Sequence, residues 1–364
     1  MAFKIVPTTE DVLPAIRELN LRIERGGGRW RFYDTGVPLW LPPEPGASVW
    51  REYFALLEEE TGVVRGGFAL KHEQFLLNGR QIQLGWLQGP VAESAVRKDL
   101  RGLGKIMVSD ATARYPMQIS WGANSIAAPS VGDSPMLLRI VRKGRFLRRA
   151  PVAHQRRALR PFVSIATALG VGQAAIALAQ AGAALRPAKV HPFTAAEHRE
   201  FGPWADEVWE KARSAYALIA VRDAHTLNRV MPPGQWPDAI PLEVRVDGRV
   251  VGWAALRDRT LEGDPLFGDL RAGSVIDALA IPGFEATVAA AAVRRLQARG
   301  VDLIGACFLH PRWISAFQRA GCLAIPKRRN IGFSKEMIEA AGGLDVLMSG
   351  THLALIDSDG PRLF

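Results

Sequence analysis

The sequence predicts a mixed α/β (α+β) protein built from two similar halves. Segments with strand periodicity and segments with helix periodicity alternate along the 364 residues, and apolar residues make up 48% of the chain. The order of these segments recurs after roughly 180 residues, which is too long for a solenoid unit and indicates a duplicated domain. One hydrophobic core rarely serves so long a chain, so we expect two domains.

The first half alternates short apolar runs with periodic segments. Thr9 is suited to cap the first helix, and the Asn78-Gly79 pair is typical of a tight hairpin turn. The expected elements are a strand at 3–6, a helix at 12–23, a helix at 49–59, two strands around the turn within 60–71, a strand from 82, a helix at 106–114, a strand at 117–121, a helix at 134–143 and a strand from 146.

The stretch from Gln81 to Pro116 organises the first half. Its strand is followed by a basic, glycine-bearing loop at 97–105 and then by a helix. Unpaired N–H groups and the positive end of a helix dipole favour bound phosphate, and Gly102 and Gly104 would let a pyrophosphate approach the backbone closely. The alternative is an ordinary glycine turn before an amphipathic helix.

The second half repeats this series. Several turn and strand residues align between the halves: Gly62 with Gly248, Gly66 with Gly252, Ala69 with Ala255, and Lys71 with Arg257. The expected elements are a strand at 188–192, helices at 204–218 and 224–230, two strands within 246–257, a strand at 275–281, a helix at 284–299, a strand at 303–309 and a helix at 313–320.

The net charge of +10 has a local origin. The interval 134–196 contains eleven Lys and Arg residues and no Asp or Glu, whereas the rest of the chain is nearly neutral. Cys307 and Cys322 are the two cysteines, so no disulfide framework or metal-binding cluster is expected. The N-terminus does not resemble a signal peptide, and we expect a cytoplasmic location.

Residues 161–185 carry no charge and are rich in Ala, Val, Ile and Leu. Their length permits a membrane span, but Gln173, Gln180 and three glycines weaken that interpretation. Two alternatives are a buried helix between the domains and a helix on a membrane surface, anchored by the cations of 139–189. The sequence leaves all three open.

The series of elements resembles the GNAT superfamily of acyl-CoA N-acyltransferases, present twice, with some similarity to FemAB-like proteins. The loop Arg101-Gly-Leu-Gly104 is similar to the family motif Gln/Arg-x-x-Gly-x-Gly/Ala, although Ile106 replaces its last small residue. The resemblance implies GNAT-like domains at 1–150 and 188–364, each a mixed, mainly antiparallel sheet flanked by helices. A basic and apolar helix at 151–187 would connect them.

The resemblance also implies that the first half binds acetyl-CoA or another acyl-CoA. The residues expected to hold this cofactor are Arg97, Arg101, Gly102, Leu103, Gly104, Lys105 and Asn124. The second half has Ile281-Pro-Gly-Phe-Glu285 at the matching place, where a carboxylate would repel pyrophosphate. We therefore expect the second half to shape the acceptor cleft instead.

Acyl transfer to an amine requires a group that accepts the amine proton. Gly89 and Pro90 interrupt a strand where the thioester is expected. Glu93, just beyond them, is the first choice for the base, with a solvated loop acid or a helix cap as the alternative. Asp277, an acid within an apolar strand, is the second choice, unless it is paired in the core.

The resemblance places the family's tyrosine acid at Ile140 and Phe317, and neither side chain can give a proton. Tyr115 and Ser109 are the remaining candidates for the acid. His72 is near a strand end and is expected to be structural.

The expected function is acyl-CoA-dependent N-acyl transfer to an amine, with an amino sugar or a lipid-linked precursor as candidate acceptors. One alternative is a FemAB-like transferase that uses aminoacyl-tRNA, in which the basic segment would hold RNA. That segment lacks interleaved aromatic residues, so nucleic acid is not the favoured partner. The other alternative is a non-catalytic GNAT-fold binding protein.

Overall fold

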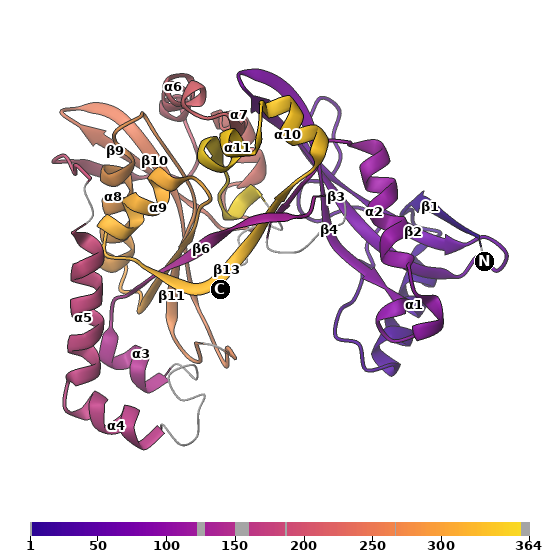
Figure 1. Ribbon diagram of the computed structural model, residues 1–364, viewed down its shortest axis with the longest axis horizontal. Coiled ribbons are helices and arrows are strands. Elements are labelled where there is room, and N and C mark those ends of the chain that lie inside the picture. The colour runs from indigo at the N-terminus through magenta and orange to yellow at the C-terminus, as the bar shows by residue number, and fades with distance from the viewer. Residues whose placement is uncertain (1, 122–127, 150–159, 186–187, 266, 358–364) are drawn as a thin grey trace. The chain divides into compact units, whose positions relative to one another are not determined.

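The computed structural model describes residues 2–121, 128–149, 160–185, 188–265 and 267–357 (Figure 1). The chain divides into two compact units. Unit 1 contains residues 1–133 and 330–347, and unit 2 contains residues 134–329 and 348–364. This division differs from the expected boundaries at 150 and 187, because segments distant in sequence belong to the same unit.

Unit 1 is built from an antiparallel sheet and helices. Its elements are β1 (Phe3–Pro7), α1 (Leu13–Arg25), β2 (Val49–Glu58), β3 (Val64–Leu77), β4 (Arg80–Ala92), the short 3-10 turns η1 (Glu93–Ala95) and η2 (Lys98–Leu100), α2 (Leu103–Arg114), β5 (Ile119–Trp121), the end of β13 (Leu323–Phe333), α10 (Lys335–Ala341) and the start of α11 (Leu344–Gly350).

The sheet of unit 1 pairs β1, β2, β3 and β4 in sequence order, each antiparallel to the next. Its two faces carry different cores. Tyr53 and Ala55 of β2 pack with α1, whereas Phe54 and Leu56 pack with α2. Because successive side chains of a strand point to opposite faces, α1 and α2 cover opposite sides of the sheet.

The predicted helix at 49–59 is wrong, since these residues form β2. Both faces of β2 are buried, so its apolar residues run almost continuously and include the helix-like spacing of Trp50, Phe54 and Leu57. A strand that is buried on both faces loses the alternation that normally identifies it. Pairing with β1 and β3 on its two edges decides the structure.

Unit 2 contains a larger mixed sheet. Its elements are most of β6 (Ser130–Ile140), α3 (Lys143–Arg149), α4 (Arg160–Ala168), α5 (Val171–Ala184), β7 (Thr194–Glu197), α6 (Pro203–Ala212), the 3-10 turn η5 (Arg213–Ala215), β8 (Leu218–Ala220), α7 (Ala224–Val230), β9 (Ile240–Val246), β10 (Arg249–Thr260), β11 (Arg271–Ala280), α8 (Glu285–Ala298), β12 (Leu303–Cys307), α9 (Pro311–Arg319), the start of β13, the end of α11, β14 (Thr351–His352) and the 3-10 turn η6 (Leu355–Asp357).

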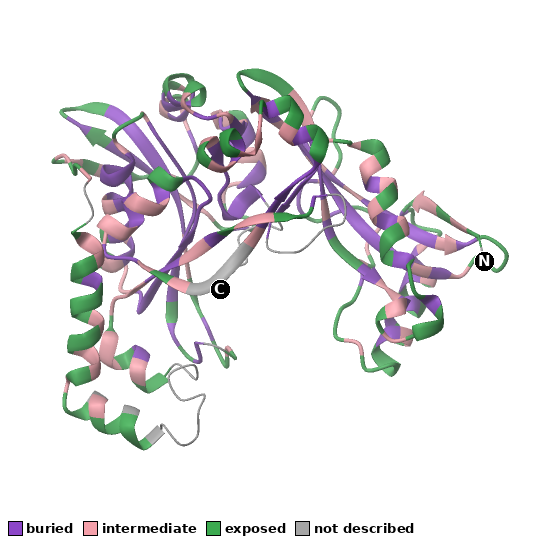
Figure 2. Cartoon of the chain, in the orientation of Figure 1, coloured by how far each residue is buried: buried purple, intermediate pink, exposed green. Residues whose placement is uncertain are grey.

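The strands of this sheet follow the order β6-β12-β11-β10-β9-β7, with β11 and β12 parallel. Helices α8 and α9 cover one face with a core of aliphatic and aromatic side chains. On the other face, Trp253 of β10 packs edge-on against Phe201, just before α6, with ring centroids 5.2 Å apart. The purple strands between green-sided helices in Figure 2 show this buried sheet.

Two further expectations are wrong. Residues 134–140 continue strand β6 instead of forming a helix, and Phe146 lies in helix α3 instead of a strand. In β6, Met136, Leu137 and Leu138 pair with β12. This neighbouring strand cannot be inferred from the aliphatic run alone. A short apolar run fits either element, so tertiary pairing decides.

The uncharged run 161–185 forms two helices, α4 and α5, separated by Gly170 in the left-handed conformation (φ +75°). Within the described residues no helix is both long and apolar enough to cross a membrane. The alternative of a buried helix does not fit the structure, because most described side chains of α4 and α5 are exposed (Figure 2).

Gly252 of β10 offers a test of the packing of unit 2. A Cβ there would lie 2.5 Å from Val288 Cγ2 and 2.7 Å from the Leu279 carbonyl oxygen. We expect Gly252→Ala to destabilise the protein by about 2 kcal/mol through overpacking. Gly182→Ala in α5 meets no atom within 4 Å and should stabilise by ~0.5–1 kcal/mol. Thermal unfolding of both variants checks this; equal midpoints would contradict the packing described.

Candidate functional site

The loop at the start of α2 has the geometry of an anion-binding site. Gly102 adopts a left-handed backbone (φ +96°) directly before the first helical residue, Leu103. The first turn of α2 contains no acidic residue, and its first N–H groups have no acceptor within the helix. Gly102, Gly104 and Lys105 are exposed, so an anion can reach these N–H groups and the positive helix end.

Cations surround this loop. Arg97, Lys98, Arg101 and Lys105 are all exposed, and Arg97 pairs with Asp99. A groove of about 470 Å³ extends along α2 from the loop. It is lined by Phe3 and Ile5 of β1 and by one face of the helix, namely Gly102, Lys105, Ile106, Ser109, Asp110 and Ala113.

Glu93 anchors the segment that leads into this loop. Its side chain is 1% exposed, and its carboxylate accepts hydrogen bonds from Arg22 Nε at 3.1 Å and Arg65 Nη1 at 3.0 Å. Burial would raise the pKa of Glu93, but the hydrogen bonds from Arg22 and Arg65 outweigh it, and the pKa is lowered. A carboxylate held by two guanidinium groups is a weak base, so this geometry argues against Glu93 as the proton acceptor.

The interruption expected at Gly89 and Pro90 is present in β4. The pairing of β3 with β4 shifts register there, because Gly67 pairs with Val91 but Ala69 pairs with Gln88. Gly89 adopts a left-handed backbone (φ +52°). Such a bulge removes ladder hydrogen bonds and leaves backbone N–H and C=O groups available to another molecule.

Three polar side chains of unit 1 connect the end of α2 with strands β3 and β2. The Tyr115 hydroxyl lies 2.6 Å from His72 Nδ1, and His72 Nε2 lies 2.7 Å from Glu52 Oε2. Burial lowers the pKa of His72 although Glu52 opposes this, and burial raises the pKa of Tyr115. His72 is therefore neutral near pH 7, with Nδ1 placed to accept the Tyr115 proton and Nε2 to donate toward Glu52.

The surroundings hold this chain in place. Trp50 stacks on the His72 ring with centroids 4.5 Å apart and planes 9° apart. Gly85 of β4 lies under Tyr115, since a Cβ at this position would be 2.4 Å from Tyr115 Cδ2. His72 lies within β3, not near a strand end as expected, and it connects a hydroxyl to a carboxylate that is partly exposed.

The second glycine loop, at the start of α8, differs in chemistry. Gly283 has the same φ as Gly102, +96°. However, Glu285 in the first turn of α8 accepts a hydrogen bond from the Gly283 N–H at 2.8 Å through Oε2. Gly283 and Glu285 line a cavity of about 430 Å³, so the loop is accessible, but the carboxylate in the first turn would repel a pyrophosphate.

Asp277 is fully buried in β11 and is paired there. Its Oδ2 lies 2.8 Å from Arg222 Nε, and the same guanidinium donates to both oxygens of Asp357 at 2.7 Å. Burial raises the pKa of Asp277 to about 7, with Arg222 opposing and Asp357 adding to the shift. The side chain has no exposed surface, so it fits the alternative of an acid paired in the core.

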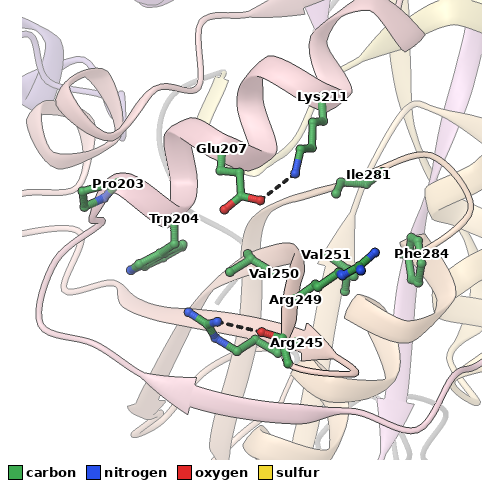
Figure 3. Close-up of a pocket in the computed structure, with 11 residues that line it drawn as sticks. Pro203, Trp204, Glu207, Lys211, Arg245, Arg249, Val250, Val251, Ile281 and Phe284 are labelled. Atoms are coloured by element: carbon green, nitrogen blue, oxygen red, sulfur yellow. Dashed lines mark hydrogen bonds and ion pairs between the residues drawn. The ribbon is translucent and has the colours of Figure 1, made fainter.

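An open pocket of about 690 Å³ lies beside the second loop (Figure 3). It is lined by Pro203, Trp204, Glu207 and Lys211 of α6, by Arg245, Gly248, Arg249, Val250 and Val251 around the β9–β10 turn, and by Ile281 and Phe284. Lys211 pairs with Glu207, and Arg245 donates to the Gly248 carbonyl at 2.9 Å. Because basic side chains outnumber acidic ones, the pocket suits a polar or anionic ligand.

The remaining expected site residues are dispersed. Asn124 lies outside the described residues. Ser109 is exposed in the groove along α2. Ile140 ends strand β6, so the helix on which its match with the family tyrosine depended is absent from that segment. Phe317 lies in α9 and is stacked on Phe308 in the core.

Sequence reasoning missed Glu52, Arg22 and Arg65 as functional neighbours. Glu52 lay in a segment predicted to be helical, which concealed that it shares a sheet with His72. Arg22 is 71 residues and Arg65 is 28 residues from Glu93. One signal was available: an acid directly after a strand bulge, in a segment otherwise basic, requires a partner.

Solved structures with a similar fold are N-acyltransferases. Saccharomyces cerevisiae N-myristoyltransferase with bound myristoyl-CoA aligns over 91% of this chain and 82% of its own, with a TM-score of 0.54 and 12% identity. The same enzyme with bound myristoyl-CoA and inhibitors aligns over 91% of this chain and 80% of its own, with a TM-score of 0.53 and 12% identity. A GCN5-related N-acetyltransferase from Anabaena variabilis aligns over 91% of this chain and 72% of its own, with a TM-score of 0.47 and 8% identity.

No protein-family model matches the sequence, and no curated protein is significantly similar to it. At these identities the structural likeness concerns the fold. The chain has a mixed α/β architecture with two sheets flanked by helices, which matches GNAT-like N-acyltransferase folds. The duplication of the domain and the similarity to FemAB-like proteins stay predictions.

Glu93→Gln tests whether the ion pairs of Glu93 with Arg22 and Arg65 stabilise the protein. Removing this charge leaves Arg22 and Arg65 without their shared partner, which should destabilise the protein by ~3 kcal/mol. Since the pKa of Glu93 is lowered from its ordinary 4.5, the stabilisation is present above pH 4.5 and is lost as pH falls through the lower folded-state pKa. Unfolding midpoints of wild type and variant should therefore differ at pH 7 and converge in acid.

Glu24→Gln is the matched control, because Glu24 forms an exposed pair with Arg31. An exposed pair contributes ~0–1 kcal/mol. Equal midpoints for the two variants at pH 7 would show that Glu93 is no anchor.

Proposed function

We propose that the chain is an acyl-CoA-dependent N-acyltransferase, which binds its donor at the α2 loop of unit 1 and transfers the acyl group to an amine. The observation that carries this proposal is the contrast between the two glycine loops. Both begin a helix after a strand and share the same glycine φ. The first turn of α2 contains no acid and follows a basic loop, whereas the first turn of α8 contains Glu285, whose carboxylate accepts a hydrogen bond from the Gly283 N–H.

The donor would be held by its pyrophosphate. The N–H groups of the first turn of α2 would bind the phosphate oxygens, and Arg97, Arg101 and Lys105 would supply positive charge. Gly102 and Gly104 leave the backbone uncovered, since a Cβ at either position would meet no atom within 4 Å. The fold shared with enzymes that bind myristoyl-CoA supports an acyl-CoA donor, and acetyl-CoA remains one candidate.

The amine proton would leave through Tyr115. When the amine nitrogen attacks the thioester carbonyl, the Tyr115 oxygen can take its proton while the hydroxyl proton moves to His72 Nδ1. Glu52 would stabilise the imidazolium that results. Cleavage of the C–S bond releases a thiolate, which takes a proton back by the same route. The backbone N–H of Gly89 in the bulge is a candidate to stabilise the carbonyl oxygen, since Pro90 has no N–H.

The acceptor is proposed to be a polar amine, with an amino sugar or a lipid-linked precursor as candidates. The basic pocket beside the second loop carries the cations Lys211, Arg245 and Arg249 and would suit a ligand with phosphate or carboxylate groups. Asp277 is not assigned a role in the transfer, because it is buried and paired.

Gly104→Glu tests donor binding. The new carboxylate would stand at the open helix end and repel the pyrophosphate, so we expect the Kd for CoA, measured by isothermal titration, to rise about tenfold or more. Gly104→Gln adds a side chain of similar size without the charge, so it should raise the Kd for CoA less than Gly104→Glu does. Gly182→Glu, at another open helical glycine, should leave the Kd unchanged. Equal affinity of Gly104→Glu and wild type would exclude this loop as the donor site.

Tyr115→Phe tests proton transfer. Loss of the hydroxyl should lower kcat about a hundredfold, with the donor Kd unchanged because the donor loop is intact. Tyr216→Phe is the control: its hydroxyl accepts from Trp313 Nε1 in the core of unit 2, and its loss should leave kcat as it is. A Tyr115→Phe protein with full kcat and an unchanged pH profile would assign the proton to water or another residue.

A further inference from the structure

Helix α5 presents an apolar stripe to solvent. Val171, Leu178 and Leu185 recur every seven residues and therefore lie on one side of the helix. They are 59%, 74% and 81% exposed. The small residues between them on this side are exposed as well: Ala174, Ala175, Ala181 and Gly182.

The opposite side of α5 faces the protein and is the more polar one. Gln180 is buried, and its Nε2 donates to the Ile140 carbonyl at 3.2 Å. Leu147 of α3 lies close to Gly172. Surface helices of globular proteins usually bury their apolar side. Helix α5 does the opposite, because its apolar side faces solvent.

Helix α4 repeats this arrangement. Phe162, Ile165 and Leu169 have the spacing of one helix face, and all three are exposed. Helices α3, α4 and α5 contact one another, and α5 also contacts α9, so they form one cluster on unit 2 (Figure 1). We call the exposed side chains of α3, α4 and α5 the α3–α5 surface. Exposed apolar side chains gathered on one such cluster mark an interaction site.

The charge of the cluster indicates what binds at this site. From residue 134 to 196 the sequence contains no acid and eleven cations. Lys143, Arg148 and Arg149 belong to α3, and the two arginines are exposed, with Arg149 Nη1 lying 4.0 Å from Asp269 Oδ2. A second copy of the chain on this surface would bring two sets of cations together. An anionic lipid surface would instead neutralise the cations and accept the apolar side chains.

We propose that the α3–α5 surface docks on an anionic membrane. Helix α5 has 14 residues, about 21 Å in length, so it would lie in the plane of the lipid headgroups. Phe162, Leu169 and Leu178 would enter the acyl boundary, and the α3 cations would contact lipid phosphates. This inference does not depend on the acyl transfer proposed above.

Flotation with vesicles tests the docking, using the full chain. Wild type should bind vesicles of phosphatidylcholine with 30% phosphatidylserine at about physiological salt, bind phosphatidylcholine alone at least tenfold more weakly, and dissociate as salt rises. The triple variant Phe162→Ser, Leu169→Ser, Leu178→Ser should bind at least tenfold more weakly. Arg148→Gln with Arg149→Gln should lose about fivefold for each cation and show a shallower salt dependence.

Two exposed apolar residues of unit 1 provide the matched control, because Trp30→Ser with Leu39→Ser should leave vesicle binding unchanged. Circular dichroism and the unfolding midpoint verify that each variant is folded. The proposal is overturned by equal binding to neutral vesicles, by absence of flotation at low salt, or by wild-type binding of the triple variant. It is also overturned if light scattering shows a dimer that the triple variant dissolves, or if the segment binds RNA but no vesicle.

Discussion

One buried carboxylate fixes the geometry on which the candidate donor site depends. Glu93 receives hydrogen bonds from Arg22 of α1 and Arg65 of β3, and so ties a helix and a strand to the first residue after β4. The backbone then enters the loop before α2 from a fixed position. Without this carboxylate, the cations Arg22 and Arg65 would add to those of the exposed loop. A buried anion below a basic loop keeps the local charge balanced while leaving the surface positive.

The two glycine loops show how a backbone can be kept while its electrostatics are changed. Gly102 and Gly283 have the same φ, and each precedes a helix. Where the sequence places no acid, the helix end remains able to bind an anion. Where it places Glu285, the side chain accepts from the Gly283 N–H and its charge would repel an anion. A single carboxylate in the first turn therefore separates the chemistry of two loops with similar geometry.

Local signals in the sequence predicted much of the fold. The Asn78-Gly79 turn adopts the expected positive φ at both residues, and helices α7 and α8 lie where periodicity placed them. Two of the errors fall on β2 and β6, whose apolar runs acquire their structure from neighbouring strands. For the site, the open loop at Gly102 was predictable because glycine and charge act locally. The pairing of Glu93 with Arg22 was not, because it joins residues 71 positions apart.

The division of the chain has a consequence for its synthesis. Unit 1 needs residues 330–347, since Ile331, Gly332 and Phe333 pair with β5 and the Ser334 hydroxyl accepts from the Gln118 N–H. A ribosome that adds 5–20 residues per second needs roughly 10–40 s to make the residues in between. During this interval β5 has emerged without its partner strand, and its edge is open to incorrect pairing. Nascent chains of this protein therefore expose a strand edge that the finished protein covers, and a strand made late in synthesis completes the unit begun first.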